Sequence, residues 1–321
     1  MDKALIIGGQ GFLGAWIARR LIREETPFVL FDLQPNAHVL EQVLEPEDLP
    51  RLERVFGDVC DREAVERAVG ESGASHIIHL AALQVPACRK DPVAGARVNV
   101  IGTLNVFEAA LARRDGVRSV VYASSAAVAG PGEDYLEPIE DATPHRPRTH
   151  YGVFKTANEG NARVYWQDHG LPSVGLRPLS IYGVGREIGI TSGPTLAIRA
   201  AVLGQDFTVP FSGITGFNYI EDVAADFVEC ARRHREGALA LNNPGERHTV
   251  EEFLEVVAEE VPECRGRLRC EGPPIPVAWD FLEAGLEGLV GEVPHTPLRE
   301  GIRRTAERFR TLRERGLLGR R

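Results

Sequence analysis

The chain has 321 residues, 43% of them hydrophobic and 26% charged, and its formal net charge is −9. This length suits one large α/β domain or two interleaved lobes around a sizeable core. The negative net charge argues against a nucleic-acid partner, because binding nucleic acid would need a basic face on this protein. The five cysteines form no C-x-x-C pair, which argues against a disulfide framework or a metal site. No apolar run approaches the ~20 residues that span a bilayer, so we expect a cytoplasmic protein without a membrane partner.

Short apolar, β-branched runs alternate with helical patterns through the first half of the chain. The runs predict six strands, at residues 4–8, 27–32, 52–58, 76–82, 119–125 and 173–183. Because the runs are apolar on both faces, they favour a parallel sheet with helices on both sides. We therefore predict a doubly wound, Rossmann-type α/β fold. The alternation ends after Gly183, and the smaller region that follows ends in a helix whose arginines are interpreted as a solvated face.

The turn after the first predicted strand is rich in glycine. The stretch "KALIIGGQGFLGAWIARRLI" spells G-x-G-x-x-G from Gly9 or G-x-x-G-x-x-G from Gly8, with Gly11 and Gly14 common to both. Such a turn places backbone N–H groups and the positive end of a helix against a pyrophosphate. Asp32 ends the second strand, near the offset expected of a ribose-binding acid. Its carboxylate would repel a 2′-phosphate, so the pattern favours NAD over NADP.

A second motif follows the fifth predicted strand. Tyr151 and Lys155 are four residues apart, so both side chains leave the same face of a helix. Ser124 and Ser125 lie at the end of the fifth strand, where doubly wound sheets place ligand chemistry. With these residues the sequence resembles the extended short-chain dehydrogenase/reductase family, of the NAD-dependent epimerase/dehydratase type.

The resemblance covers nearly the whole chain, and its motifs follow in the family's order. They are "GDVCD" (57–61), "HLAA" (79–82), "NVIGTLNVFEAA" (99–110), "SSAAVAG" (124–130), "LRPLSIYG" (176–183), "NYIEDVA" (218–224) and "TPLREGIRRT" (296–305). Each motif is weak alone, but the ordered set selects Gly8, Gly11 and Gly14 as the nucleotide turn. It implies an NAD-binding domain at residues 1–175 and a mainly substrate-binding lobe at 176–321, with segments at about 218–242 returning to the first domain.

The cofactor site that the resemblance implies runs along the ends of the predicted strands. Its residues are Gly8, Gly11, Phe12, Leu13, Gly14, Asp32, Asp58, Val59, Leu80, Ala81, Ala82, Asn99, Lys155, Pro178 and Ile181. Asn99 either caps the helix that it opens or helps to hold the nicotinamide end. The substrate candidates are Gln84, Ser125, Ala126, Ser180, Arg186, Thr191 and Ser192, each equally compatible with ordinary loop structure. Among them, Arg186 suits a carboxylate or a phosphate.

Ser125, Tyr151 and Lys155 suit hydride transfer at a secondary alcohol or, in reverse, at a ketone. Tyr151 would take the hydroxyl proton, which requires its pKa to fall from about 10 towards neutrality. The positive charge of Lys155 favours the phenolate, and by resemblance this lysine also binds the nicotinamide ribose. Ser125 would hydrogen-bond the substrate oxygen. His79 lies in an apolar strand and is interpreted as a packed structural histidine.

Departures from the family's pattern bear on the reaction. Ala126 and Ala127 stand where family dehydratases carry an Asp-Glu pair, which disfavours dehydration. Phe217 and Asn218 occupy the region where nucleotide-sugar enzymes place a diphosphate-binding arginine, and Ser180 lies near the place of a usual asparagine. We therefore predict an NAD-dependent dehydrogenase acting on a sugar, a sugar acid or a related polyol. The alternatives are a sugar or nucleotide-sugar epimerase that retains its NAD and, more remotely, a non-catalytic NAD(H)-binding sensor.

The helices that contain Asn99 and Tyr151 resemble those through which this family often dimerises as a four-helix bundle. The small residues Gly102, Ala109 and Ala110 would let two such helices approach closely, although they equally suit packing on the sheet. We therefore expect a homodimer that acts on a small hydroxylated molecule.

Overall fold

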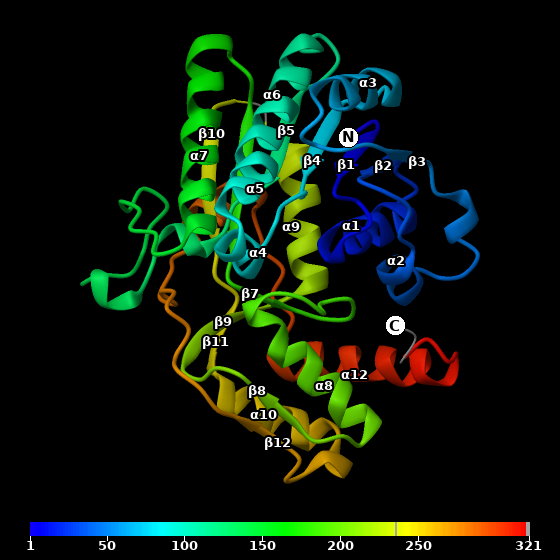
Figure 1. Cartoon of the computed structure of the whole chain (residues 1–321), viewed down its shortest axis with the longest axis vertical. Helices are drawn as coiled ribbons and strands as arrows, with labels where there is room; N and C mark the ends of the chain where they lie inside the picture. Colours follow the sequence, from blue (N-terminus) through cyan, green and yellow to red (C-terminus); the bar gives the residue numbers. More distant parts are fainter. Residues whose placement is uncertain (235, 319–321) are drawn as a thin grey trace.

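A computed structural model describes residues 1–234 and 236–318, and its centre is a seven-stranded sheet (Figure 1). The strands are β1 (Ala4–Ile7), β2 (Phe28–Asp32), β3 (Arg54–Phe56), β4 (His76–His79), β5 (Ser119–Ala123), β6 (Ser173–Pro178) and β10 (Ala238–Asn243). They lie in the order β10-β6-β5-β4-β1-β2-β3, and every neighbouring pair is parallel. The predicted doubly wound α/β fold is confirmed, and all these strands end at one edge of the sheet.

Both faces of the sheet are buried, as the apolar runs predict. In β1, Ala4 and Ile6 contribute to one hydrophobic core, whereas Leu5 and Ile7 contribute to another. Successive side chains of a strand point to opposite faces, so a strand covered on both sides needs apolar residues at every position. On one face, α1 (Phe12–Arg23) packs against α9 (Ile220–Arg233).

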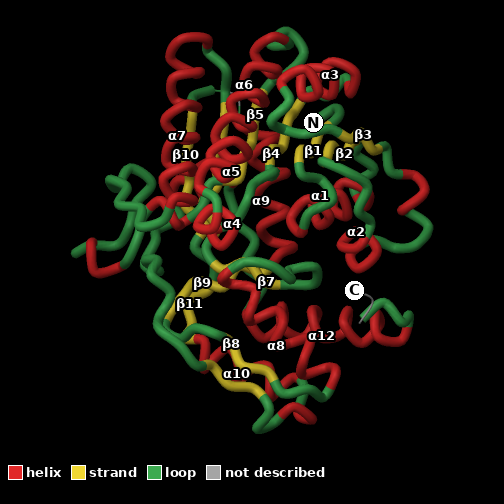
Figure 2. Tube along the Cα trace, viewed as in Figure 1, coloured by secondary structure: helices red, strands yellow, loops and turns green. Residues whose placement is uncertain are grey.

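The opposite face carries α3 (Arg62–Ser72), α6 (Gly102–Ala112) and α7 (His150–His169), which lie side by side (Figure 2). A longer helical segment leads into α6, beginning with α5 (Pro92–Ala96) and passing through a π-helical turn at Arg97–Ile101. The short helices α2 (His38–Val43) and α4 (Val85–Lys90) follow β2 and β4. None of the helices in the described part of the chain is long and apolar enough to cross a membrane.

The sixth predicted strand, 173–183, is two strands in two different sheets. After β6 ends at Pro178, β7 (Ser180–Tyr182) pairs with β9 (Ile214–Tyr219), which also pairs with β11 (Glu246–Thr249). The chain turns at Leu179, whose backbone N–H donates to the side-chain oxygen of Asn218 (3.1 Å). The apolar run is continuous across this break, so hydrophobicity alone could not reveal it.

A smaller unit lies at the carboxyl edge of the sheet, below it in Figure 1. Its helices are α8 (Gly193–Leu203), α10 (Val250–Glu260) and α12 (Leu298–Glu314), and its short strands β8 (Phe207–Val209) and β12 (Leu268–Cys270) are paired. Helix α10 packs against both α8 and α12, whereas α11 (Ala284–Val290) packs against α9 and β10.

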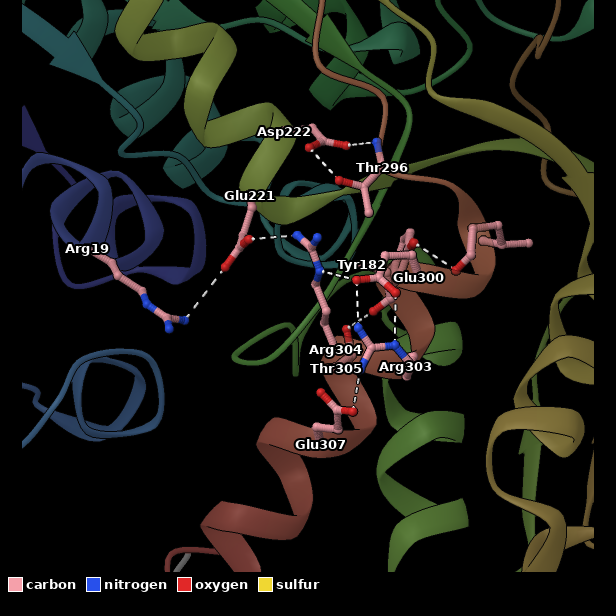
Figure 3. Close-up of polar contacts among 12 residues, drawn as sticks. Arg19, Tyr182, Glu221, Asp222, Thr296, Glu300, Arg303, Arg304, Thr305 and Glu307 are labelled. Carbon is pink, nitrogen blue, oxygen red and sulfur yellow. Dashed lines mark hydrogen bonds and ion pairs between the residues drawn. The ribbon is translucent and has the colours of Figure 1, made fainter. Parts of the chain in front are cut away.

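The first turn of α9 ties α12 to the sheet domain (Figure 3). Glu221 forms ion pairs with Arg19 of α1 (3.8 Å) and with Arg304 of α12 (3.4 Å). The carboxylate of Asp222 accepts hydrogen bonds from the backbone N–H (2.7 Å) and the hydroxyl (2.8 Å) of Thr296. The segments "NYIEDVA" and "TPLREGIRRT" therefore meet in space.

The arginines of α12 do not all form a solvated face. The side chain of Arg308 is only 13% exposed, and it donates to the carbonyls of Val43 (3.1 Å) and Leu44 (3.0 Å) at the end of α2. It also pairs with Glu45 (2.7 Å). The solvated-face interpretation is wrong for this residue, because its guanidinium binds the last carbonyls of another helix.

Candidate functional site

The glycine turn joins β1 to α1 at the carboxyl edge of the sheet. Gly8 has a φ of +84°, and a Cβ on it would lie 2.7 Å from the backbone nitrogen of Ala81. A Cβ on Gly14 would lie 2.6 Å from the carbonyl oxygen of Gly8, so both positions require glycine. Gly11 is exposed and is the N-cap of α1, which no side chain caps. The first N–H groups of the helix are therefore left for an anion.

Asp32 ends β2 beside this turn. Its Oδ2 accepts a hydrogen bond from the backbone N–H of Gln10 (2.9 Å), and its Oδ1 accepts one from the N–H of Leu33 (2.8 Å). The buried side chain of Gln10 in turn bonds the backbone of Gln34 (2.7 Å) and of Asn36 (3.1 Å). Sequence analysis passed over Gln10 because it is a variable position of the glycine motif, yet it holds the loop in which the Asp32 carboxylate lies.

The other predicted cofactor residues lie at the ends of neighbouring strands. Phe12 and Leu13 begin α1, Asp58 and Val59 follow β3, Leu80, Ala81 and Ala82 follow β4, Pro178 ends β6 and Ile181 lies in β7. Asp58 is exposed, and its Oδ1 accepts a hydrogen bond from the N–H of Cys60 (2.8 Å). The parallel sheet thus gathers these separate segments along one edge.

Asn99 does not open a helix. The helical segment begins at Pro92, and Asp91 caps it by accepting a hydrogen bond from the N–H of Ala94 (2.9 Å). The buried amide of Asn99 accepts from the N–H of Leu83 (2.7 Å) and donates to the Leu83 carbonyl (2.8 Å). The capping interpretation is wrong, because the motif that begins at Asn99 starts inside the helix. The amide instead fixes the loop after β4.

Ser125, Tyr151 and Lys155 come from the end of β5 and the start of α7. Ser125 follows β5 by two residues, and Lys155 lies one helical turn after Tyr151. The Nζ atom of Lys155 is 5.5 Å from the centroid of the Tyr151 ring. A Cβ on Gly152 would lie 2.3 Å from the carbonyl oxygen of Ala127, so the glycine after the tyrosine allows α7 to approach the serine loop.

Burial shifts the pKa of both catalytic candidates on α7. It raises the pKa of Tyr151, while a hydrogen bond with Ser125 and the positive charge of Arg186 act in the opposite direction. The predicted fall in the pKa of Tyr151 is therefore not seen in the protein alone. Burial removes water from the phenolate and outweighs the two groups that would lower the pKa. Burial also lowers the pKa of Lys155 to about 8, and its Nζ donates a hydrogen bond to the Ala123 carbonyl.

A buried polar cluster that sequence analysis missed lies behind Ser125. The hydroxyl of Ser124 donates to the carboxylate of Glu159, which forms a bidentate ion pair with Arg177 (2.9 and 2.7 Å). Arg177 also donates to the side-chain oxygen of Asn242 (3.1 Å). The cluster thereby joins the ends of β5, β6 and β10 to α7 and fixes the backbone that carries Ser125.

Two of the predicted substrate residues lie against the guanidinium of a third. Nη2 of Arg186 donates to the hydroxyl of Thr191 (3.2 Å). The amide of Gln84, oriented to donate to the Ile188 carbonyl, accepts from Nη1 of Arg186 (3.2 Å). The positive charge of Arg186 also acts on the pKa of Tyr151, so this group interacts electrostatically with a catalytic candidate.

The remaining predicted substrate residues are engaged in contacts within the protein. The hydroxyl of Ser180 is 2.9 Å from that of Thr215, and the Ser192 hydroxyl donates to the Gly189 carbonyl (2.9 Å). Ala126 is 2% exposed and packs in a small apolar cluster. The structure therefore brings Gln84 and Thr191 together around Arg186, whereas the hydroxyls of Ser180 and Ser192 are already bonded within the protein.

His79 is a buried histidine in β4. Its Nε2 is 3.0 Å from the hydroxyl of Thr103, and burial lowers its pKa to about 3. A ring that stays neutral near pH 7 suits a packed, structural role.

A separate cavity of about 380 Å³ lies among the start of α9, the strands β9 and β11, and the loop 293–297. Asp226 lines it and is only 2% exposed. Its Oδ2 accepts a hydrogen bond from Asn243 (2.7 Å), whereas its Oδ1 has no partner among the described residues. Burial raises the pKa of Asp226 to about 7. None of the residues predicted to bind cofactor or substrate lines this cavity.

The fold and its carboxyl edge define a Rossmann-type, nucleotide-binding protein. The NAD dependent epimerase/dehydratase family matches residues 4–241, and the chain belongs to this family. A UDP-glucose 4-epimerase of Mycolicibacterium smegmatis is 28% identical over 324 residues, which cover 96% of this chain and 98% of the relative. A putative UDP-glucose 4-epimerase of Methanocaldococcus jannaschii is 24% identical, over 94% of this chain and 96% of the relative.

Solved structures agree with this assignment. The UDP-glucose 4-epimerase of Thermus thermophilus in complex with NAD superposes with a TM-score of 0.80 at 29% identity, covering 96% of this chain and 99% of that one. A partial consensus L-threonine 3-dehydrogenase gives a TM-score of 0.83 at 22% identity, over 96% and 99% of the two chains, and shows the fold alone. The predicted family is confirmed, and the chain is an NAD-dependent enzyme of the extended short-chain dehydrogenase/reductase type.

Proposed function

We propose that this enzyme is a dehydrogenase that interconverts a secondary alcohol and a ketone on a sugar, a sugar acid or a related polyol. The observation that carries the proposal is the convergence of two side chains on Tyr151. Ser125 interacts with its hydroxyl, and the Lys155 ammonium lies 5.5 Å from its ring centroid. In this role Ser125, Tyr151 and Lys155 are the catalytic residues.

Each of the three residues performs a distinct task. Tyr151 takes the proton of the substrate hydroxyl, and its hydrogen bond with Ser125 and the positive charge of Arg186 favour the phenolate against the effect of burial. Ser125 donates to the substrate oxygen as this oxygen gains negative charge. The ammonium of Lys155 is held by its hydrogen bond to the carbonyl of Ala123.

The residues along the carboxyl edge fit NAD. Gly8 and Gly14 pack against the backbone of Ala81 and of the turn itself too closely to carry a Cβ, which fixes the turn, and the uncapped start of α1 offers N–H donors to a pyrophosphate. The Asp32 carboxylate is placed for ribose hydroxyls. When bound, NAD⁺ supplies the hydride acceptor, so that the alcohol loses a hydride and a proton and becomes a ketone. In this proposal residues 176–321 mainly bind the substrate, with segments at about 218–242 returning to the NAD-binding domain.

An epimerase that retains its NAD is the second candidate, because the similar proteins named above are UDP-glucose 4-epimerases. An epimerase must hold a distal part of the substrate while the keto intermediate turns over. The segment 214–219 carries no arginine of its own that would bind a diphosphate, and the Ser180 hydroxyl is bonded to that of Thr215. Both features favour a dehydrogenase with a smaller substrate.

We also propose a homodimer built from the helical segment 92–112 and α7. Four apolar side chains on these helices are strongly exposed in the single chain: Val93 (67%), Ile101 (48%), Val153 (48%) and Val164 (48%). Exposed apolar residues gathered on neighbouring helices suit a protein interface. A four-helix bundle between two copies would bury them.

A substrate panel followed at 340 nm, with mass analysis of the cofactor in the purified protein, tests the proposed reaction. Stoichiometric accumulation of NADH with one alcohol supports the dehydrogenase. Tightly retained NAD(H), with inversion at one carbon and no net NADH, would instead establish the epimerase.

A further inference from the structure

Arg186 is a cation at the catalytic site whose protein partners are uncharged. It lies in the loop after β7, and its guanidinium is 5.7 Å from the centroid of the Phe12 ring at the start of α1. Its two terminal nitrogens donate to Thr191 and to the amide oxygen of Gln84, at 3.2 Å each. Its Nε is buried and has no partner among the described residues.

This guanidinium has no counter-ion among the described residues. The adjacent carboxylate of Glu187 is engaged elsewhere, since it pairs with His38 (3.0 Å) and accepts a hydrogen bond from Gln42 (3.0 Å). Burial lowers the pKa of Arg186. Burying a charge is unfavourable unless it is paired, so the position of this guanidinium calls for an anion.

The surrounding loop holds the guanidinium where its charge acts on Tyr151. The charge of Arg186 lowers the pKa of Tyr151, and Tyr151 in turn raises that of Arg186, so the two groups interact. Gly189 has a φ of +110°, and a Cβ there would lie 2.1 Å from an amide atom of Gln84 and 3.1 Å from Nη2 of Arg186. Glycine at this position lets the loop close over both side chains.

We propose that Arg186 binds a carboxylate of the substrate, so that the substrate class is a hydroxy acid with its carboxylate close to the carbon that is oxidised. The inference rests on the proposed dehydrogenase function. A planar guanidinium matches a carboxylate in shape and charge, and the neutral Gln84 and Thr191 leave its charge available. The carboxylate itself is unchanged: the alcohol becomes a ketone, its hydroxyl proton passes to Tyr151 and its hydride passes to NAD⁺.

The pyrophosphate of NAD is the other oxyanion that could meet this guanidinium. The glycine turn and the uncapped start of α1 already supply donors for it. Arg186 donates to Gln84 and its charge acts on Tyr151, which favours a ligand on the substrate side. Binding measurements on the two ligands separate these sources.

Calorimetric titration of the full chain saturated with NADH tests the proposal without requiring turnover. The probes are two matched pairs, D-gluconate with D-glucitol and D-glycerate with glycerol. We expect at least one acid to bind roughly tenfold more tightly than its alcohol, and Arg186→Gln to remove this preference. Arg186→Lys should retain part of it, because the charge remains but the planar fork is lost. Arg67→Gln, the same change at an exposed position on α3, should bind as the unmodified chain does.

Two results would overturn the carboxylate assignment. In the first, neither acid binds more tightly than its matched alcohol in the unmodified chain. In the second, Arg186→Gln weakens NADH binding by roughly tenfold and leaves the acid preference intact, which assigns the guanidinium to the pyrophosphate. An acid preference that depends on Arg186, together with no net NADH from any alcohol of the substrate panel, would instead reject the dehydrogenase and keep the carboxylate site.

Discussion

Glu159 and Arg177 form a buried bidentate ion pair directly behind the serine motif. Their side chains are 7% and 3% exposed, and the two nitrogen–oxygen distances are 2.9 and 2.7 Å. The same carboxylate accepts the hydroxyl hydrogen of Ser124, the residue before Ser125. Glu159 is therefore a positioning residue, because it holds the end of β5 without itself reaching the substrate.

Replacing Glu159 with Gln should destabilise the fold strongly. The substitution keeps the shape of the side chain but removes the carboxylate that pairs with the buried Arg177, which costs about 3 kcal/mol in comparable buried pairs. Denaturant unfolding measures the loss of stability. Glu63→Gln removes a carboxylate that pairs with Arg67 on the surface, and it should cost less than about 1 kcal/mol. Equal losses of unfolding free energy in the two variants would show that the buried ion pair contributes no more to stability than the surface pair.

The strands and the nucleotide turn could be predicted because local patterns determine them. Continuous apolar runs identify strands buried on both sides, and the glycines of the first turn are required by the backbone approach at Gly8 and Gly14. The spacing of Tyr151 and Lys155 likewise places both on one face of a helix. None of these inferences depends on which distant segment packs nearby.

Side-chain partners could not be predicted, since they join residues that are distant in the sequence. Glu159 lies one helical turn after Lys155, a spacing that could have drawn attention to it, but its partner Arg177 comes from β6. The Ser180 hydroxyl is bonded to that of Thr215, 35 residues later in the chain. The absence of a counter-ion for Arg186 among the described residues also emerges only when the surrounding loops are placed.

Tyr151→Phe should remove the catalytic base. We expect kcat/KM for the alcohol identified in the substrate panel to fall by about 10²–10⁴-fold, with NAD affinity preserved, because only the hydroxyl that accepts the proton is lost. Stopped-flow kinetics at 340 nm and a titration with NAD measure the two quantities. Tyr165→Phe on the same helix is the control, since that hydroxyl bonds Glu108. Normal turnover by Tyr151→Phe would reject the proposed mechanism.

The chain should bind NADH more tightly than NADPH. The Asp32 carboxylate is held beside the glycine turn by the N–H of Gln10, where it would repel a 2′-phosphate. Asp32→Ala should weaken NADH binding and narrow the gap between the two dinucleotides in fluorescence titrations. Asp58→Ala should change the affinity for NADH and the affinity for NADPH by the same factor. Tighter binding of NADPH by the unmodified chain would contradict this account of specificity.

Lys155→Met should abolish turnover while making the fold more stable near pH 7. The pKa of Lys155 is lowered from 10.5 to about 8 by burial, which corresponds to a cost of about 3 kcal/mol while the lysine is charged. Losing its hydrogen bond to Ala123 offsets about 1 kcal/mol of the gain. Because the folded pKa is below the unfolded one, this cost disappears as the pH rises from about 8 to about 10.

Thermal unfolding between pH 7 and 10 measures the effect of the lysine. The advantage of Lys155→Met should shrink as the pH rises through this range. Lys90→Met, at an exposed position on α4, should change the stability by less than about 0.5 kcal/mol at every pH. A Lys155→Met variant that is less stable than the unmodified chain at pH 7 would show that the buried ammonium is compensated.

Asp226→Asn should stabilise the fold in a manner that depends on pH. Burial raises the pKa of Asp226 to about 7, above the ~3.9 of an unfolded aspartate. Between these two values the folded chain holds a proton that the unfolded chain has lost, so the unmodified protein loses stability as the pH rises from about 4 to about 7. Asparagine does not titrate, and its side-chain oxygen can still accept the hydrogen bond from Asn243. The variant should therefore gain stability over the unmodified chain progressively from pH 5 to pH 8 in urea unfolding. A difference that stays constant across this range would contradict the raised pKa of Asp226 in the folded protein.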